Sequence, residues 1–260
     1  METEKTIDSC FIMPVLPHRI GNVRDFCDDI SEKYRGSSDE QMKGVGIKRL
    51  LIFLQAMPDK GDFLVFHMQT RDSLEKTLSE LFTTSMKCSK YMTDSFKDFT
   101  GKDMSKKENM PKIELLAKWE EKSKTLEEKD MLKMPWCYAV PFKKGKTEEI
   151  KKLADEMMRT KAADIEHLMQ EHDIVKKMTF LQHTPEGDFA VGHILTSHPL
   201  DELIASMKTC QSEICDYSRK YMKEYMDMDI FSKENSVELL LKWDEKEGFK
   251  TAEQLIAYTE

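Results

Sequence analysis

Two stretches of sequence decide the fold of this chain. Residues 53–67 read FLQAMPDKGDFLVFH, and residues 180–193 read FLQHTPEGDFAVGH. Both hold Phe-Leu-Gln, a proline, Gly-Asp-Phe, a valine and a histidine in the same order, and the second copy is one residue shorter. In both, apolar runs flank a proline, an acidic residue and a glycine, which favour a turn. Each stretch therefore predicts a β-hairpin, and their likeness indicates an internal repeat.

The likeness extends on both sides of the hairpins. CFIMP at residues 10–14 returns as CYAVP at residues 137–141, and ELLAKWE at 114–120 returns as ELLLKWD at 238–244. We therefore divide the chain into repeat 1 at residues 1–122, a linker at 123–135, repeat 2 at 136–247 and a C-terminal tail at 248–260. We expect the Lys- and Glu-rich linker to be a partly helical surface segment and the tail to pack as a short helix.

Each repeat shows the same succession of periodicities. A short apolar strand ends at Pro14 or Pro141, because proline cannot donate a hydrogen bond within a sheet. An amphipathic helix follows, then the hairpin, a second and longer helix, and a final strand that ends near Trp119 or Trp243. The order β-α-β-β-α-β is that of the ferredoxin-like unit.

The strand at residues 50–54 reads LLIFL and is apolar at every position. A strand has this composition when both of its faces are buried. The helices of one ferredoxin-like unit cover a single face of its sheet, so we expect the second repeat to cover the other face. We therefore predict an α+β fold, in which two ferredoxin-like βαββαβ repeats form an intrachain pseudo-two-fold α+β barrel.

Composition argues against several classes of partner. The chain has 260 residues, with 40 Lys and Arg against 48 Asp and Glu, and a net charge of −8. This charge predicts that neither nucleic acid nor an anionic membrane is a partner. The longest apolar stretch, at residues 50–54, is far shorter than the roughly 20 residues of a membrane-spanning helix. A tandem that covers its own sheets needs no second subunit, so we expect a monomer, and assembly through sheet edges remains open.

Location and redox state are predicted from similar features. The N-terminus lacks the basic and apolar regions of a secretory signal. The six cysteines are scattered through a chain that is large enough to fold without disulfides. We therefore expect reduced thiols and a cytoplasmic location.

On these residues and this order of elements, the chain resembles the dimeric α+β-barrel superfamily, with two ferredoxin-like copies in tandem. Repeat 2, through LQHTPEGDF at residues 181–189, is also similar to small uncharacterised members that carry the same TPEGD hairpin. The resemblance implies a cleft between sheet and helices in each copy. Members of the superfamily include cofactor-independent monooxygenases, haem-degrading and haem-dependent enzymes, small isomerases and amino-acid-sensing modules. No catalytic triad of a characterised member matches here, so no residue role is transferred from the family.

The repeat places a histidine at one position of both hairpins, since His67 and His193 correspond. Alternation along the strand puts this histidine on an apolar face, where a polar ring needs a hydrogen-bond partner. Gln55 and Gln182 end the neighbouring strands and are the expected partners. Two interpretations stay open. The histidine is a general base or a ligand in the cleft, or its hydrogen bonds only hold the barrel together.

Repeat 2 is the expected location of the site, because five of the seven histidines fall there: His167, His172, His183, His193 and His198. The predicted catalytic residue is His193, which acts as the general base. The predicted ligand-binding residues are Gln182, His183, His67, Gln55 and Trp243.

No metal site is predicted from the spacing of the potential ligands. His167 and His172 lie five residues apart, which corresponds to about 140° around a helix. Cys210 and Cys215 have the same spacing. Two zinc-binding side chains four residues apart lie on one face of a helix. At a spacing of five residues, neither of these pairs does. The sequence does not identify a cofactor.

The sequence therefore predicts a protein that binds a small apolar or aromatic molecule in the cleft of repeat 2. One hypothesis is a cofactor-independent oxygenase or isomerase. A second is a ligand-binding or sensing module without turnover, and a third is a structural or interaction barrel.

Overall fold

The computed structural model describes residues 5–57, 59–122, 134–228 and 236–251. They form two compact units. Unit 1 comprises Met1–Lys112 and Ser236–Glu260, and unit 2 comprises residues 113–235. Most of the predicted linker lies outside the described residues, as does the tail beyond residue 251, so the expected helical content of the linker stays a prediction.

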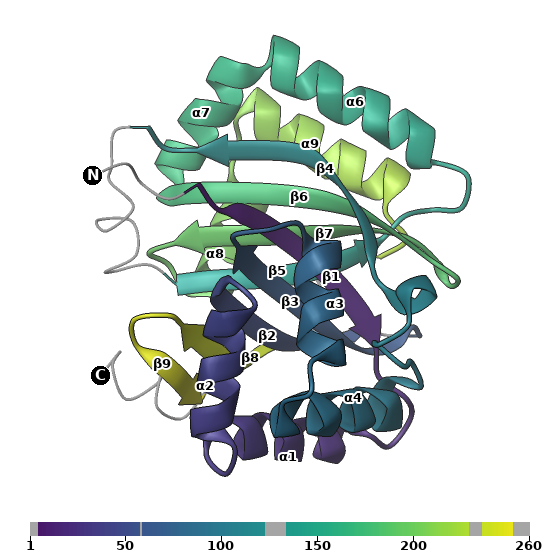
Figure 1. Ribbon diagram of the computed structural model, residues 1–260. Coiled ribbons are helices and arrows are strands. Elements are labelled where there is room, and N and C mark those ends of the chain that lie inside the picture. The colour runs from purple at the N-terminus through teal and green to yellow at the C-terminus, as the bar shows by residue number, and fades with distance from the viewer. Residues whose placement is uncertain (1–4, 58, 123–133, 229–235, 252–260) are drawn as a thin grey trace. The chain divides into compact units, whose positions relative to one another are not determined.

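Unit 1 is an antiparallel sheet with helices packed on it (Figure 1). The order of its strands is β1-β3-β2-β8-β9. Its elements are β1 (Ile7–Pro14), α1 (Ile20–Ser31), α2 (Arg35–Gly44), β2 (Ile47–Met57), β3 (Gly61–Thr70), α3 (Leu74–Thr83), α4 (Lys87–Thr100), the 3-10 turn η1 (Lys107–Asn109), β8 (Ser236–Asp244) and β9 (Gly248–Thr251).

Unit 2 has the same kind of architecture, and the order of its strands is β4-β6-β7-β5. Its elements are β4 (Lys112–Glu120), β5 (Met134–Pro141), α6 (Thr147–Thr160), α7 (Ala162–Glu171), β6 (Ile174–Thr184), β7 (Gly187–Thr196), α8 (Leu200–Thr209) and α9 (Glu213–Tyr225). The predicted α+β class is confirmed, and both predicted hairpins are present as β2–β3 and β6–β7.

The last strands of the two repeats are exchanged between the units. β8, which ends repeat 2, pairs with β2 of repeat 1, and Phe53 lies opposite Leu239. β4, which ends repeat 1, lies beside β6 of repeat 2. The boundaries of the sequence repeats therefore differ from those of the compact units. Periodicity identifies a strand but not its neighbour, and both last strands carry the same Leu- and Trp-containing motif.

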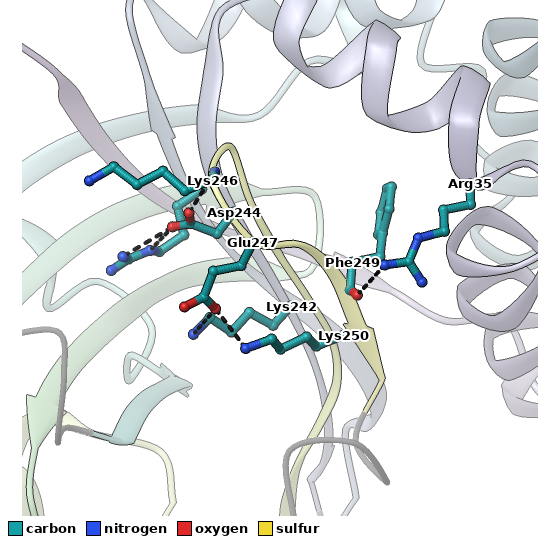
Figure 2. Close-up of polar contacts among 8 residues, drawn as sticks. Arg35, Lys242, Asp244, Lys246, Glu247, Phe249 and Lys250 are labelled. Carbon is teal, nitrogen blue, oxygen red and sulfur yellow. Dashed lines mark hydrogen bonds and ion pairs between the residues drawn. The ribbon is translucent and has the colours of Figure 1, made fainter. Parts of the chain in front are cut away.

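The described part of the tail, residues 248–251, is a strand, and the rest of the segment expected to form a short helix lies outside the described residues. β9 pairs with β8, and Phe249 lies opposite Trp243 with the ring centroids 6.3 Å apart. Gly248 has a φ of 74°, which glycine adopts at low cost and which lets the chain turn back. Figure 2 shows the ion pairs at this turn, where Glu247 binds Lys250 at 2.7 Å and Lys242 at 3.8 Å. Side-chain pairing across the turn therefore favours a hairpin.

One pair of cysteines differs from the expected reduced state. Cys210 and Cys215 form a disulfide, with their Cα atoms 6.0 Å apart. The other four cysteines, Cys10, Cys27, Cys88 and Cys137, are buried and form no disulfide. The rule that predicted reduced thiols concerns the compartment of a protein, whereas here the turn between α8 and α9 brings two thiols within bonding distance.

Within the described residues, no helix is long and apolar enough to cross a membrane. The cytoplasmic location and the monomeric state stay predictions.

Trp243 anchors the exchanged strand in unit 1. Its side chain is fully buried, and its Nε1 donates a hydrogen bond to Asp39 Oδ1 at 3.0 Å. We expect Trp243→Phe to lower the free energy of unfolding by about 1.5 to 3 kcal/mol, the net value of a hydrogen bond to a charged group. Urea unfolding followed by circular dichroism measures this loss. Trp119→Phe is the control, because Trp119 has no hydrogen-bond partner among the described residues, and an equal loss in both variants contradicts the prediction.

Candidate functional site

Unit 2 contains a cavity of about 190 Å³ between its sheet and the helices α6, α7 and α9, which lie together in Figure 1. Its wall is mainly aliphatic and aromatic. The lining residues from the sheet are Leu116, Ala117, Trp119, Tyr138, Val140, Lys177, Thr179 and Ala190, with Phe142 following β5. Those from the helices are Ala154, Met157, Met158, Ile165, Leu168, Met169, Ile214, Ser218, Tyr221 and Met222, with Met226 following α9.

Strand alternation explains which side chains form the floor of the cavity. Lys177 and Thr179 are two residues apart on β6 and therefore share a face. In the sheet register, Gly192 of β7 lies opposite both Thr179 and Tyr138. A Cβ atom at Gly192 would lie 2.4 Å from Tyr138 Cζ. Only glycine at this position lets the Tyr138 ring lie across β7.

The helix side of the cavity combines pliable and polar groups. Met157 and Met158 come from α6, and Met222 comes from α9. Methionine has an unbranched and polarisable side chain, so this wall can adapt to ligands of different shape. Burial raises the pKa of the Tyr221 hydroxyl, which is therefore a neutral hydrogen-bond donor at physiological pH.

Among the described residues that line the cavity, Lys177 is the only lysine or arginine. Burial lowers the pKa of its ammonium group below the ordinary 10.5. Within the described residues, no carboxylate forms an ion pair with Lys177, so no counter-charge offsets the loss of hydration. Such an amine can accept a proton as a base. Its ammonium form can bind an anionic oxygen of a ligand.

The equivalent space in unit 1 is filled. Leu50 and Ile52 stand where unit 2 has Lys177 and Thr179, and Phe11 and Phe66 stand where it has Tyr138 and Gly192. The Phe11 and Phe66 rings are stacked, with centroids 4.7 Å apart. The space left there is about 30 Å³, which holds one or two water molecules at most. Of the two equivalent places, unit 2 is therefore the one that has room for an organic ligand.

The predicted base lies on the other face of the unit 2 sheet. His193 is buried and alternates along β7 with Gly192 and Ile194, which face the cavity and the helices. Gln182 is also buried, and neither residue lines the cavity. His183 is exposed, and its Nδ1 lies 2.7 Å from Asp188 Oδ1. The roles of these three residues in catalysis or binding stay predictions.

The other predicted ligand-binding residues lie in unit 1. The His67 ring is buried, with its Nε2 3.0 Å from Asp8 Oδ1, and Gln55 is buried on β2. Trp243 lies in the core beside β9. Because the last strands are exchanged, Trp119 lines the cavity of unit 2 in place of Trp243.

Lys177 and Tyr138 were not predicted as site residues. A signal for both is present in the sequence, because comparison of the repeats aligns Lys177 with Leu50 and Tyr138 with Phe11. A lysine in one repeat at a position where the other repeat has an apolar residue indicates that this position has a different role in the two repeats.

Comparisons with known proteins support the fold. No family model matches the chain, and a search of curated proteins also finds no match. Among solved structures, an anthrone oxidase-like protein matches with a TM-score of 0.52 at 10% identity, over 95% of each chain. A "putative monooxygenase" from Fusobacterium nucleatum matches with a TM-score of 0.50 at 9% identity, over 96% of this chain and 98% of the other. The chain thus shares the α+β fold of these two structures, and at this identity the likeness extends to the fold alone.

Proposed function

We propose that unit 2 binds a small aromatic molecule with an acidic oxygen or carbon, and that it oxidises this molecule with O₂ without a cofactor. The observation that carries the proposal is the cavity of about 190 Å³ beside Lys177, in a place that unit 1 fills with stacked phenylalanines. The two repeats then have different roles, because one copy has an open cavity and the other copy is filled.

The size and lining of the cavity favour one or two aromatic rings. An apolar cavity of about 150 Å³ in another protein binds benzene. The methionines of α6 and α9 allow the space in unit 2 to expand somewhat beyond its 190 Å³. Trp119 and Tyr138 offer faces on which a flat ligand can stack, and Thr179 and Tyr221 offer hydroxyl groups.

The chemistry follows from the lowered pKa of Lys177. In its neutral form, which burial favours, the amine takes a proton from a phenol or from a ring methylene that is made acidic by a neighbouring carbonyl group. The resulting anion is then held beside the new ammonium ion in apolar surroundings. O₂ is itself apolar and enters such a cavity. For a methylene group the overall change is CH₂ + O₂ → C=O + H₂O, in which O₂ oxidises the carbon and supplies both product oxygens.

Binding and oxygen uptake test this proposal together. We expect phenols of one and two rings to quench tryptophan fluorescence, since Trp119 lines the cavity. We expect an anthrone, chosen for the anthrone oxidase-like structural neighbour, to cause protein-dependent O₂ consumption in an oxygen electrode, with one O₂ used per quinone formed. Binding without O₂ uptake would instead favour a sensing module. Absence of binding across the panel would favour the structural barrel.

A further inference from the structure

We propose that Cys210 and Cys215, once reduced, form with His172 a binding site for a soft divalent metal ion such as Zn²⁺. One potential ligand atom from each of these residues lies within 4.8 Å of the other two. Two thiolates and one imidazole are the ligands that zinc prefers. This site is separate from the cavity beside Lys177 and does not depend on the proposed oxidation.

The fold brings together three residues that the sequence keeps apart. His172 follows α7 directly, Cys210 follows α8 directly, and Cys215 lies in the first turn of α9. The two cysteines are therefore not on one helix, and the angular argument that excluded them from the sequence does not apply. Three element ends converge here on one point of unit 2.

The His172 ring has the surroundings of a metal ligand. Its Nδ1 lies 3.0 Å from Ser206 Oγ, and the residue is 4% exposed. Its Nε2 is buried and has no hydrogen-bond partner among the described residues. Metal-binding histidines are commonly oriented in this way, with one ring nitrogen held by a hydrogen bond and the other free to bind the ion. Burial also lowers the pKa of His172, which keeps the ring in its neutral, metal-binding form.

The disulfide makes the site dependent on redox state. Reduction transfers two electrons and two protons from a dithiol to the Cys210–Cys215 bond, and the dithiol becomes a disulfide. The ion then binds both thiolates and the His172 nitrogen, and two thiol protons are released. Oxidised, the two sulfurs are joined to each other and cannot act as thiolates. Metal binding and disulfide formation therefore exclude each other.

Cobalt titration tests the site directly. Full-length protein is reduced with a phosphine, which adds no competing thiol, and Co²⁺ is added without oxygen. We expect one equivalent to bind, with a thiolate-to-cobalt charge-transfer band and intense visible bands, and Zn²⁺ to displace it. The oxidised protein is the matched control and should give no charge-transfer band. A reduced protein that gives no such band overturns the proposal.

Variants separate this site from the four other cysteines. We expect Cys210→Ser and Cys215→Ser each to weaken the charge-transfer band. We expect His172→Asn and the positioning variant Ser206→Ala to weaken Co²⁺ affinity by about 10-fold or more. His198→Asn, which changes a partly exposed histidine after β7, should bind Co²⁺ as the wild type does. Because Ser206→Ala removes no ligand and only one hydroxyl group, it tests the site if a cysteine variant fails to fold. Unchanged affinity in His172→Asn overturns the proposal.

Discussion

Replacing Lys177 with methionine is expected to abolish binding of phenolic ligands and, at the same time, to stabilise the protein. The side chain keeps its length and loses its amine, so the cavity retains its shape but not its base. Burying a polar group without a hydrogen bond costs on the order of 1 to 3 kcal/mol. We expect Lys177→Met to recover about this amount in urea unfolding at neutral pH. If Lys177 served stability alone, Lys177→Met would instead lower the free energy of unfolding.

The stabilisation should also depend on pH in a defined direction. In the folded protein the pKa of Lys177 lies below the 10.5 of the unfolded chain. Between these two values the unfolded state binds more protons, so the stability of the wild type rises with pH. Lys177→Met lacks this dependence. The pH-dependent part of its advantage is therefore largest below the pKa of the folded state and disappears as the pH rises past 10.5.

A neighbouring lysine provides the control for this experiment. Lys176 precedes Lys177 on β6, is buried, and does not line the cavity. Lys176→Met should leave ligand binding intact. Retained binding in Lys177→Met, or a loss of stability there, contradicts the assigned role of Lys177.

Local pattern predicted the hairpins of this fold, and it missed α2, whose buried face is largely polar. Residues 47–57 and 61–70 form the first hairpin that the turn residues and apolar runs indicated. Helix α2 has no apolar stripe, and its buried side chains are Ser38, Gln41 and Met42. Gln41 Nε2 donates to the Leu81 carbonyl and to Ser89 Oγ, both at 2.6 Å. A helix that packs through hydrogen bonds gives no hydrophobic periodicity to detect.

The candidate site shows a second limit of sequence reasoning. The strands of both hairpins are apolar on both faces, so alternation separates His193 from Gly192 but does not tell which face the helices cover. The cluster of His172, Cys210 and Cys215 could not be predicted either, because His172 is far from the two cysteines in the sequence and only the fold brings the three together. Comparison of the repeats is more informative, because the same strand carries Leu50 in one copy and Lys177 in the other.

The second large effect is expected at Gly192, where alanine should close the cavity. Gly192 is not among the positions with positive φ, so alanine meets no backbone strain there. Its Cβ would lie 2.4 Å from Tyr138 Cζ and 2.7 Å from Tyr138 Cε1. No real contact is this short, so the ring must leave the surface of β7. On this face of the sheet the cavity is the space open to it, and we expect the ring to swing there.

Gly192→Ala should therefore weaken the binding of phenolic ligands at least about tenfold, which corresponds to 1.4 kcal/mol. It should also lower the free energy of unfolding by roughly 1 to 3 kcal/mol, the usual cost of overpacking. Gly36→Ala on α2 is the control, because a Cβ there meets no atom within 4 Å. That variant should leave binding unchanged.

A double-mutant cycle shows whether the Tyr138 ring causes the effect. In a Tyr138→Leu background the contact with an added Cβ is relieved, so Gly192→Ala should cost far less stability than it does alone. Residues in direct contact usually show coupling energies of about 0.5 to 3 kcal/mol. Additive losses in the cycle would mean that the cavity depends on something other than this glycine and this ring. Strong coupling, together with recovered ligand affinity in the double variant, would mean that the absence of a side chain at position 192 keeps unit 2 open where Phe66 closes unit 1.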